Sequence, residues 1–309
     1  MTDFALPAAV TLVEVGARDG LQNEKQPVST ADKLELIKCL QAAGSRCIEA
    51  TAFVSPKWVP QMADHAQVMA GLPRREGVCY SALVPNAQGL EAALRARVDE
   101  VVIFPAASES FCRRNLNGSL DEVMSRFAAV AHGAREAGLR VRGVISCCLG
   151  CPLEGEVALA QVERVVLGLK NLGVDHIGIA DTIGVGTPAR VQEVMRMTLG
   201  HFPAQRISGH FHDTYGQALA NVYASLLVGI HHFDTSIAGL GGCPYAPGAT
   251  GNVSTEDVVY MLHGLGIQTG LDLDALIGTG QWISDRLGRQ NASRVGRAVL
   301  ARRAGTARA

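Results

Sequence analysis

Two histidines stand two residues apart in the segment GHFHD, residues 209–213. Because side chains alternate between the two faces of a strand, His210 and His212 would share one face while Phe211 lies on the other. Two neighbouring imidazoles near a strand end are typical of a metal-ligand pair. We expect Asp213 to face away from them and to cap a helix or hydrogen-bond locally.

Other groups that could join this site also follow β-favouring runs. The segment GARDG places the guanidinium of Arg18 beside the carboxylate of Asp19, and Glu49 and Asp181 lie near the ends of two further runs. Each alone would be an ordinary salt-bridge partner, and Arg-Asp dipeptides are common on protein surfaces. Gathered at one place with two histidines, they would form an acidic site able to hold a divalent cation.

A loop rich in glycine and proline, GLGGCPYAPGATGN at residues 239–252, carries the thiol of Cys243 and the amide of Asn252. It follows the last β-favouring run, so in a closed barrel Cys243 could bend over the mouth and Asn252 could lie near Asp19. One carboxylate, two imidazoles and one amide oxygen suit six-coordinate Mg²⁺ or Mn²⁺ with two positions open for a substrate. Zinc stays an alternative.

Eight short β-favouring runs, each followed by a helix-like segment, would position these residues. The runs are TLVEV (11–15), RCIEA (46–50), VCYSALV (78–84), EVVIF (100–104), VRGVIS (141–146), HIGIAD (176–181), RISGHFHD (206–213) and FDTSIAG (233–239). This alternation predicts parallel strands, and eight units match a single α/β TIM barrel, (β/α)8, whose active site lies at the C-terminal ends of the strands. A doubly wound open sheet is the alternative, but no GxGxxG follows the first run.

We expect residues 1–285 to form the catalytic barrel and residues 286–309 to add a basic C-terminal helix or tail to the same domain. This last segment holds seven arginines and no acid. It is interpreted as a capping helix with a frayed end, or alternatively as a contact for substrate phosphates.

The composition narrows the class of protein. The chain has 309 residues, 48% hydrophobic and 18% charged, which predicts a large buried core, and its net charge of -1 argues against a nucleic-acid partner. No signal-peptide or transit-peptide pattern opens the chain, and the uncharged stretch 214–233 is polar enough to favour a packed helix over a membrane span. We therefore expect a cytoplasmic protein with reduced cysteines, in which Cys148 and Cys151 lack a second pair for a zinc site.

Several stretches in order along the chain resemble the 3-hydroxy-3-methylglutaryl-CoA lyases, a family of metal-dependent TIM-barrel lyases related to isopropylmalate synthase. They are VEVGARDGLQNE, FVSPKWVPQMADH, SCCLGCPLEG, DTIGVGTP, GHFHDTYGQALAN and AGLGGCPYAPGATGNVSTEDVVYML, spanning residues 13 to about 262. The resemblance implies cleavage of that thioester to acetyl-CoA and acetoacetate through an enolate, as in leucine degradation and ketone-body formation. It also implies an acyl-CoA substrate, a divalent metal and a homodimer.

Roles for single residues follow from the same resemblance. The metal ligands would be Asp19, His210, His212 and Asn252. Arg18 would stabilise the enolate on the thioester oxygen, and Cys243 would take part in proton transfer from its loop. Glu49 and Asp181 would be supporting carboxylates, and Lys25 would lie near the CoA-binding face.

Three positions depart from the family pattern. Ala52, Val144 and Gly178 stand where the family usually has serine, tyrosine and serine, all facing the acyl pocket. The loss of three hydroxyl groups, each worth about 1 kcal/mol as a hydrogen bond, predicts a larger and more apolar pocket. A bulkier or less acidic 3-hydroxyacyl-CoA is therefore the alternative substrate for the same chemistry.

Other classes fit the sequence less well. A two-histidine, one-carboxylate iron oxygenase would not require Arg18 beside the metal acid, Asn252 as a further ligand or a thiol loop. A condensing relative of isopropylmalate synthase would usually carry a further C-terminal region. A non-catalytic binding barrel predicts that Asp19→Asn leaves function intact.

Overall fold

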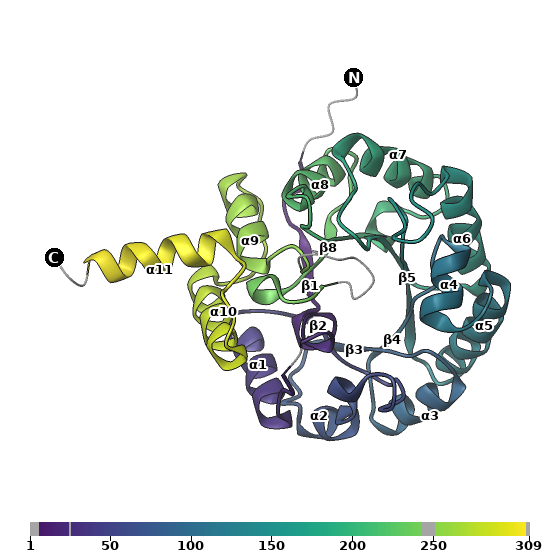
Figure 1. The fold of residues 1–309 in the computed structure, drawn as a ribbon, viewed down its shortest axis with the longest axis horizontal. Helices are drawn as coiled ribbons and strands as arrows, with labels where there is room; N and C mark the ends of the chain where they lie inside the picture. Colours follow the sequence, from purple (N-terminus) through teal and green to yellow (C-terminus); the bar gives the residue numbers. More distant parts are fainter. Residues whose placement is uncertain (1–5, 25, 243–250, 307–309) are drawn as a thin grey trace.

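The structure, a computed structural model, describes residues 6–24, 26–242 and 251–306. Its parallel strands pair in sequential order and close into a barrel, because β8 returns to pair with β1 (Figure 1). This confirms the predicted TIM barrel. The strands are β1 (Thr11–Glu14), β2 (Cys47–Ala52), β3 (Cys79–Leu83), β4 (Glu100–Ile103), β5 (Arg140–Ile145), β6 (His176–Asp181), β7 (Ile207–Phe211) and β8 (His232–Thr235).

Helices form a ring around the barrel (Figure 1). One helix follows each strand, α4 is inserted between β4 and α5, and α10 and α11 extend the chain beyond α9. The helices are α1 (Thr30–Ala42), α2 (His65–Gly71), α3 (Ala87–Arg95), α4 (Glu109–Leu116), α5 (Leu120–Glu136), α6 (Leu159–Leu172), α7 (Pro188–Leu199), α8 (Ala218–Leu226), α9 (Thr255–Gly264), α10 (Leu273–Leu287) and α11 (Arg294–Thr306). Short turns of other helix types are η1 (Gly16–Gly20), η2 (Pro60–Met62), η3 (Ala204–Arg206) and η4 (Ile237–Gly239).

Alternation along the strands separates the core from the site. In β4, Val101 and Ile103 are fully buried, while Val102 between them lines a cavity inside the barrel. In β6, Ile179 is fully buried and Ala180 lines the same cavity. One face of each strand therefore packs against the helices, and the other is free to carry polar groups at the barrel mouth.

Side-chain caps are found where helices begin. Ser29 caps α1 by accepting a hydrogen bond from the backbone N–H of Asp32. Asp213, predicted to bond locally, accepts one from the N–H of Ala218 at the start of α8. This α8 is the packed helix expected within residues 214–233. No described helix is long and apolar enough to cross a membrane.

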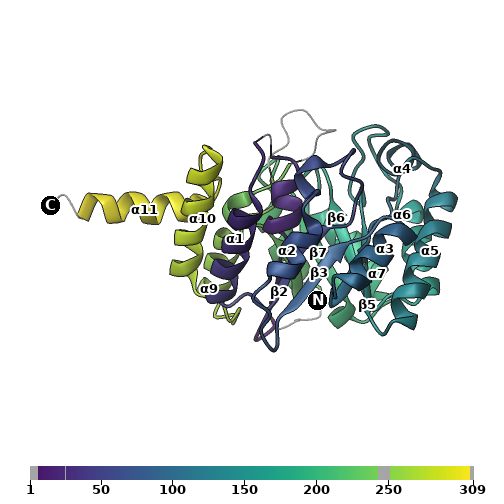
Figure 2. The same cartoon turned by 90° about the horizontal axis from the view of Figure 1, so that it is seen from below.

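The C-terminal helices lie on one side of the barrel. The α10 helix packs beside α1 and α9, whereas α11 projects away from the body of the molecule (Figure 2). The boundary predicted between residues 285 and 286 falls inside α10, which runs to Leu287. Within the basic segment, residues 294–306 form α11.

Candidate active site

The loop after β1 brings a buried cation to the barrel mouth. Arg18 is 8% exposed, and its Nε donates to Glu49 Oε1 at 2.6 Å while Nη1 donates to Asp19 Oδ1 at 2.7 Å. Burial opposes the charge, but the two carboxylates outweigh it and raise the pKa of the guanidinium. Arg18 therefore stays charged at any pH at which the protein is folded.

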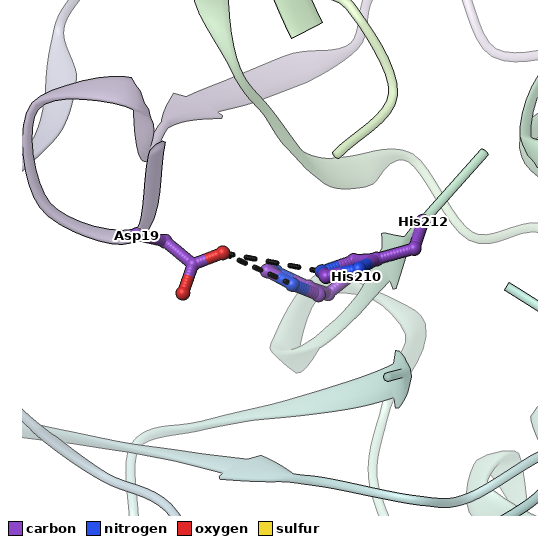
Figure 3. A group of neighbouring side chains, drawn as sticks. All are labelled: Asp19, His210 and His212. Atoms are coloured by element: carbon purple, nitrogen blue, oxygen red, sulfur yellow. Dashed lines mark ion pairs between the residues drawn. The ribbon is translucent and has the colours of Figure 1, made fainter. Parts of the chain in front are cut away.

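Asp19 faces the two predicted histidines across a short gap (Figure 3). Its Oδ2 lies 3.9 Å from Nε2 of His210 and 4.0 Å from Nε2 of His212. Burial alone would raise the pKa of Asp19, but Arg18 and the imidazoles lower it to about 2. Burial, and then the neighbouring His210, lower the pKa of His212 to about 4. Asp19 is therefore ionised and His212 neutral, the states in which they can bind a metal. Burial opposes the charge on His210, but the hydrogen bond to Asp234 and the nearby carboxylates outweigh it and raise the pKa of His210.

The spacing of these three residues fits a cation. One ligand atom from each lies within 4.8 Å of the others, and no other group of three such residues in the described part of the chain meets this criterion. Metal–ligand bonds of about 2.0–2.2 Å would place an ion between atoms at such separations. The structure therefore brings Asp19, His210 and His212 together, as a shared metal site would require.

Asn252 joins this group from the far side of the glycine-rich loop. Its Nδ2 donates to Asp19 Oδ2 at 2.8 Å, and its backbone forms a β-bridge with His212. Its side-chain oxygen Oδ1 is buried and has no hydrogen-bond partner. A buried, unpaired amide oxygen beside a carboxylate and two imidazoles completes a donor set that fits Mg²⁺ or Mn²⁺.

The two supporting carboxylates have different environments. Glu49 lies within β2 rather than at its end, because the strand runs on to Ala52, yet its side chain reaches Arg18. Asp181 ends β6 as expected, but it accepts hydrogen bonds from the backbone N–H groups of Val185 and Gly186, at 3.1 and 2.8 Å. Its neighbours Ala180 and Thr182 line the cavity. Asp181 therefore shapes the loop after β6.

Two predicted residues lie outside the described part of the chain: Lys25 and Cys243. Gly242, immediately before Cys243, lines the cavity, and its carbonyl oxygen accepts a hydrogen bond from Asn23 Nδ2 at 2.9 Å. The loop after β1 and the loop after β8 thus touch at the barrel mouth.

A cavity of about 1020 Å³ contains the site. Its lining includes Arg18 and the metal-site trio, apolar side chains such as Val144 and Trp58, and polar groups such as Arg126. Val144 lies opposite Gly178 in the pairing of β5 with β6. The volume exceeds that of most drug-sized pockets, so a large substrate with an apolar segment can enter.

Four buried charged residues around the site were not predicted. Asp234 and Arg142 lie inside the barrel, and Glu14 and Glu256 lie under the loops after β1 and β8. Each occurs in or beside a predicted strand or helix, but no local spacing links it to a partner. Their partners are visible only in the folded structure.

The fold and the site define a class: a TIM barrel with a candidate metal site and a buried arginine at the wall of a large cavity. A family model described as HMGL-like matches residues 9–283, and the chain belongs to this family.

Relatives and a solved structure agree with this assignment. The chain is 55% identical to the 3-hydroxy-3-isohexenylglutaryl-CoA/hydroxy-methylglutaryl-CoA lyase of Pseudomonas aeruginosa, covering 96% of this chain and 99% of the relative. It is 53% identical to the hydroxymethylglutaryl-CoA lyase of Pseudomonas mevalonii, covering 96% and 98%. A structure of an HMG-CoA lyase from an Acinetobacter species, in complex with coenzyme A and 3-methylmalate, has a TM-score of 0.91 at 35% identity, with 96% and 97% covered.

Proposed function

We propose that this protein cleaves 3-hydroxy-3-methylglutaryl-CoA to acetyl-CoA and acetoacetate. The observation that carries the proposal is the convergence of Arg18 with Asp19, His210 and His212 at one cavity wall. The hydroxymethylglutaryl-CoA lyases at 50–55% identity support the substrate.

Four residues would hold the metal: Asp19, His210, His212 and Asn252. We expect Mg²⁺ or Mn²⁺, with Zn²⁺ less suited, because the set mixes carboxylate and amide oxygens with imidazoles. When bound, such a cation supplies Lewis acidity to the substrate's hydroxyl and acyl oxygens.

Arg18 would stabilise the negative charge that develops on the thioester oxygen as the carbon–carbon bond breaks. Its Nε and Nη1 are held by Glu49 and Asp19, whereas Nη2 donates to no described residue. A fixed donor in a buried site needs no reorganisation when that charge appears. Glu49 thereby acts as a supporting carboxylate.

The new acetyl carbon must then receive a proton. We assign this step to Cys243 on the strength of the family resemblance. Asp181 is proposed to support the site by holding the loop after β6, and Lys25 to contact the CoA portion of the substrate. The bacterial relatives support a cytoplasmic location, and a homodimer is our expectation for the assembly.

The bulkier-substrate alternative is not favoured. Relatives at 50–53% identity are named hydroxymethylglutaryl-CoA lyase alone, and the P. aeruginosa relative named for an isohexenyl substrate carries the hydroxymethylglutaryl name as well. A large apolar pocket around Val144 would therefore widen the substrate range rather than replace the methyl substrate.

Turnover of 3-hydroxy-3-methylglutaryl-CoA tests the proposal. With Mg²⁺ or Mn²⁺ present, we expect equal amounts of acetyl-CoA and acetoacetate, and Arg18→Gln should lower kcat roughly 10²- to 10³-fold, the usual effect of removing an oxyanion donor. Arg74→Gln, which breaks an exposed pair with Asp99, is the matched control and should keep full activity. A wild-type protein that binds metal and CoA without cleaving this thioester would refute the assigned substrate.

A further inference from the structure

One of the two candidate metal-ligand histidines has a buried carboxylate behind it. Nδ1 of His210 lies 3.0 Å from Oδ2 of Asp234, which is 2% exposed. The two residues are register partners on β7 and β8, so the barrel itself sets this contact. Nδ1 of His212, in contrast, is buried and has no hydrogen-bond partner.

The other oxygen of Asp234 is held from across the barrel. Arg142 on β5 is 2% exposed, and its Nη2 donates to Asp234 Oδ1 and, at 2.8 Å, to Ser208 Oγ on β7. Each carboxylate oxygen of Asp234 thus has one partner, an imidazole on one side and a guanidinium on the other. The carboxylate plane cannot rotate without breaking one of these bonds.

Stability does not explain this arrangement. TIM-barrel interiors are usually filled by branched apolar side chains, and a buried ion pair seldom stabilises a fold more than apolar residues of similar size would. Nε and Nη1 of Arg142 also have no partner, which adds an unfavourable desolvation term. The pair therefore needs another role.

We propose that Asp234 and Arg142 are positioning residues for metal binding. Asp234 accepts the Nδ1–H of His210, which leaves the Nε2 lone pair directed toward Asp19, and Arg142 fixes the orientation of Asp234. Carboxylates behind histidine ligands commonly play this part, and their loss weakens metal affinity roughly 10- to 100-fold. The inference rests on the proposed metal site.

Metal affinity, measured without substrate, tests this proposal separately from the lyase activity. Mn²⁺ is titrated into metal-free protein and the free ion is followed by electron paramagnetic resonance. We expect Asp234→Asn to raise the Kd for Mn²⁺ roughly 10- to 100-fold, and Arg142→Lys, which keeps the charge but loses the planar fork, to raise it less. Failure of thioester cleavage would not alter these values.

A second histidine–carboxylate pair supplies the matched control. His201 Nε2 lies 2.8 Å from Glu163 Oε1 on the outer surface, so Glu163→Gln removes a similar contact far from the cavity and should leave the Kd unchanged. A folded Asp234→Asn protein with the Kd of the control would overturn the proposal, since a purely structural pair would alter only the melting temperature.

The wild-type protein offers a test if both variants fail to fold. In the Mg²⁺-loaded protein, a histidine-selective ¹H–¹⁵N spectrum should show a hydrogen-bonded, slowly exchanging Nδ1 proton on His210. The absence of that proton, in a spectrum where other buried imidazole protons are seen, would also overturn the proposal.

Discussion

Arg18 illustrates how single residues define the chemistry of this site. Its charge is buried and balanced by Glu49 on one nitrogen and by Asp19 on another. Asp19 in turn faces His210 and His212, so the proposed anion-stabilising group and the proposed metal site share one carboxylate. The enolate and the chelated part of the substrate would thus lie next to each other.

Val144, which stands where the family usually has tyrosine, can be tested by substitution. Val144 is half-buried and lines the cavity, so a larger side chain at this position can extend into it. Val144→Tyr should restore one hydrogen bond of about 1 kcal/mol, raising kcat/KM for 3-hydroxy-3-methylglutaryl-CoA about fivefold over Val144→Phe. Steady-state kinetics of the two variants measures this.

The Phe variant separates volume from hydrogen bonding, because it fills the same space without a hydroxyl group. Both variants should lose turnover of thioesters with bulkier 3-substituents. Equal kinetics for Tyr and Phe on the methyl substrate would mean that no hydroxyl is needed at this position.

At the scale of elements, two buried glutamates join the loops that carry the site. Glu14 Oε1 accepts the backbone N–H groups of Gly16 and Ile237, at 2.8 and 2.9 Å. A Cβ at Gly16 would lie 2.6 Å from that oxygen, so any other residue would displace the carboxylate of Glu14. Glu256 accepts the N–H of Ala238 at 3.0 Å. The loop with Asp19 is thereby attached to the loop after β8.

These glutamates predict an unusual dependence of stability on pH. Burial raises the pKa of Glu14 to about 7 and that of Glu256 to about 8, from an ordinary 4.5. A raised carboxyl pKa favours the protonated folded state, so its stabilisation is complete below pH 4.5 and is lost as the pH rises through the folded value. For Glu256 the loss spans about pH 4.5 to 8.

Glu256→Gln should flatten this part of the profile, because glutamine cannot ionise. Melting temperatures at pH 5, 6.5 and 8, measured with EDTA present, should fall less in the variant than in the wild type. Glu35→Gln, which alters an exposed pair with Lys38, should keep the wild-type slope. Identical slopes for all three proteins would show that Glu256 does not titrate in this range.

At the scale of the whole molecule, α11 stands apart from the catalytic barrel (Figure 2). Gly296 is its only buried residue. Asp257 holds the start of the helix: it accepts hydrogen bonds from Ser293 Oγ and from the backbone N–H groups of Arg294 and Val295. All of these contacts lie before residue 297. The pair of Arg303 with Asp274 is exposed and contributes little.

Deleting residues 297–309 should therefore leave the melting temperature and the KM for the acyl-CoA substrate unchanged. Kinetics and calorimetry of the truncated protein check this, with a triple variant, Arg297→Gln, Arg302→Gln and Arg303→Gln, to separate charge from helix. A rise in KM in both proteins would favour the other interpretation, in which the tail arginines meet substrate phosphates. Light scattering of the same samples measures the expected dimer mass.

The barrel and the residues at its strand ends follow from local patterns in the sequence. Strand runs such as HIGIAD alternate with helical segments, and each pattern can be recognised locally. The alternation predicts a parallel sheet, and eight such units match a closed barrel. Parallel strands end at the same edge of the sheet, which predicts that Asp19, His210 and His212 are neighbours. The strand periodicity of two placed both histidines on one face.

The contacts that support the site form only in the folded chain. Asp234 is 24 residues from His210 and 92 from Arg142, and Glu14 is 223 residues from Ile237. The sequence also did not show that the carboxylate of Asp181 accepts a hydrogen bond from the backbone of the loop that follows it. Local patterns specify which face of a strand a side chain occupies. Its partners depend on the strand register and on which side chains meet inside the barrel, and both are set only when the barrel closes.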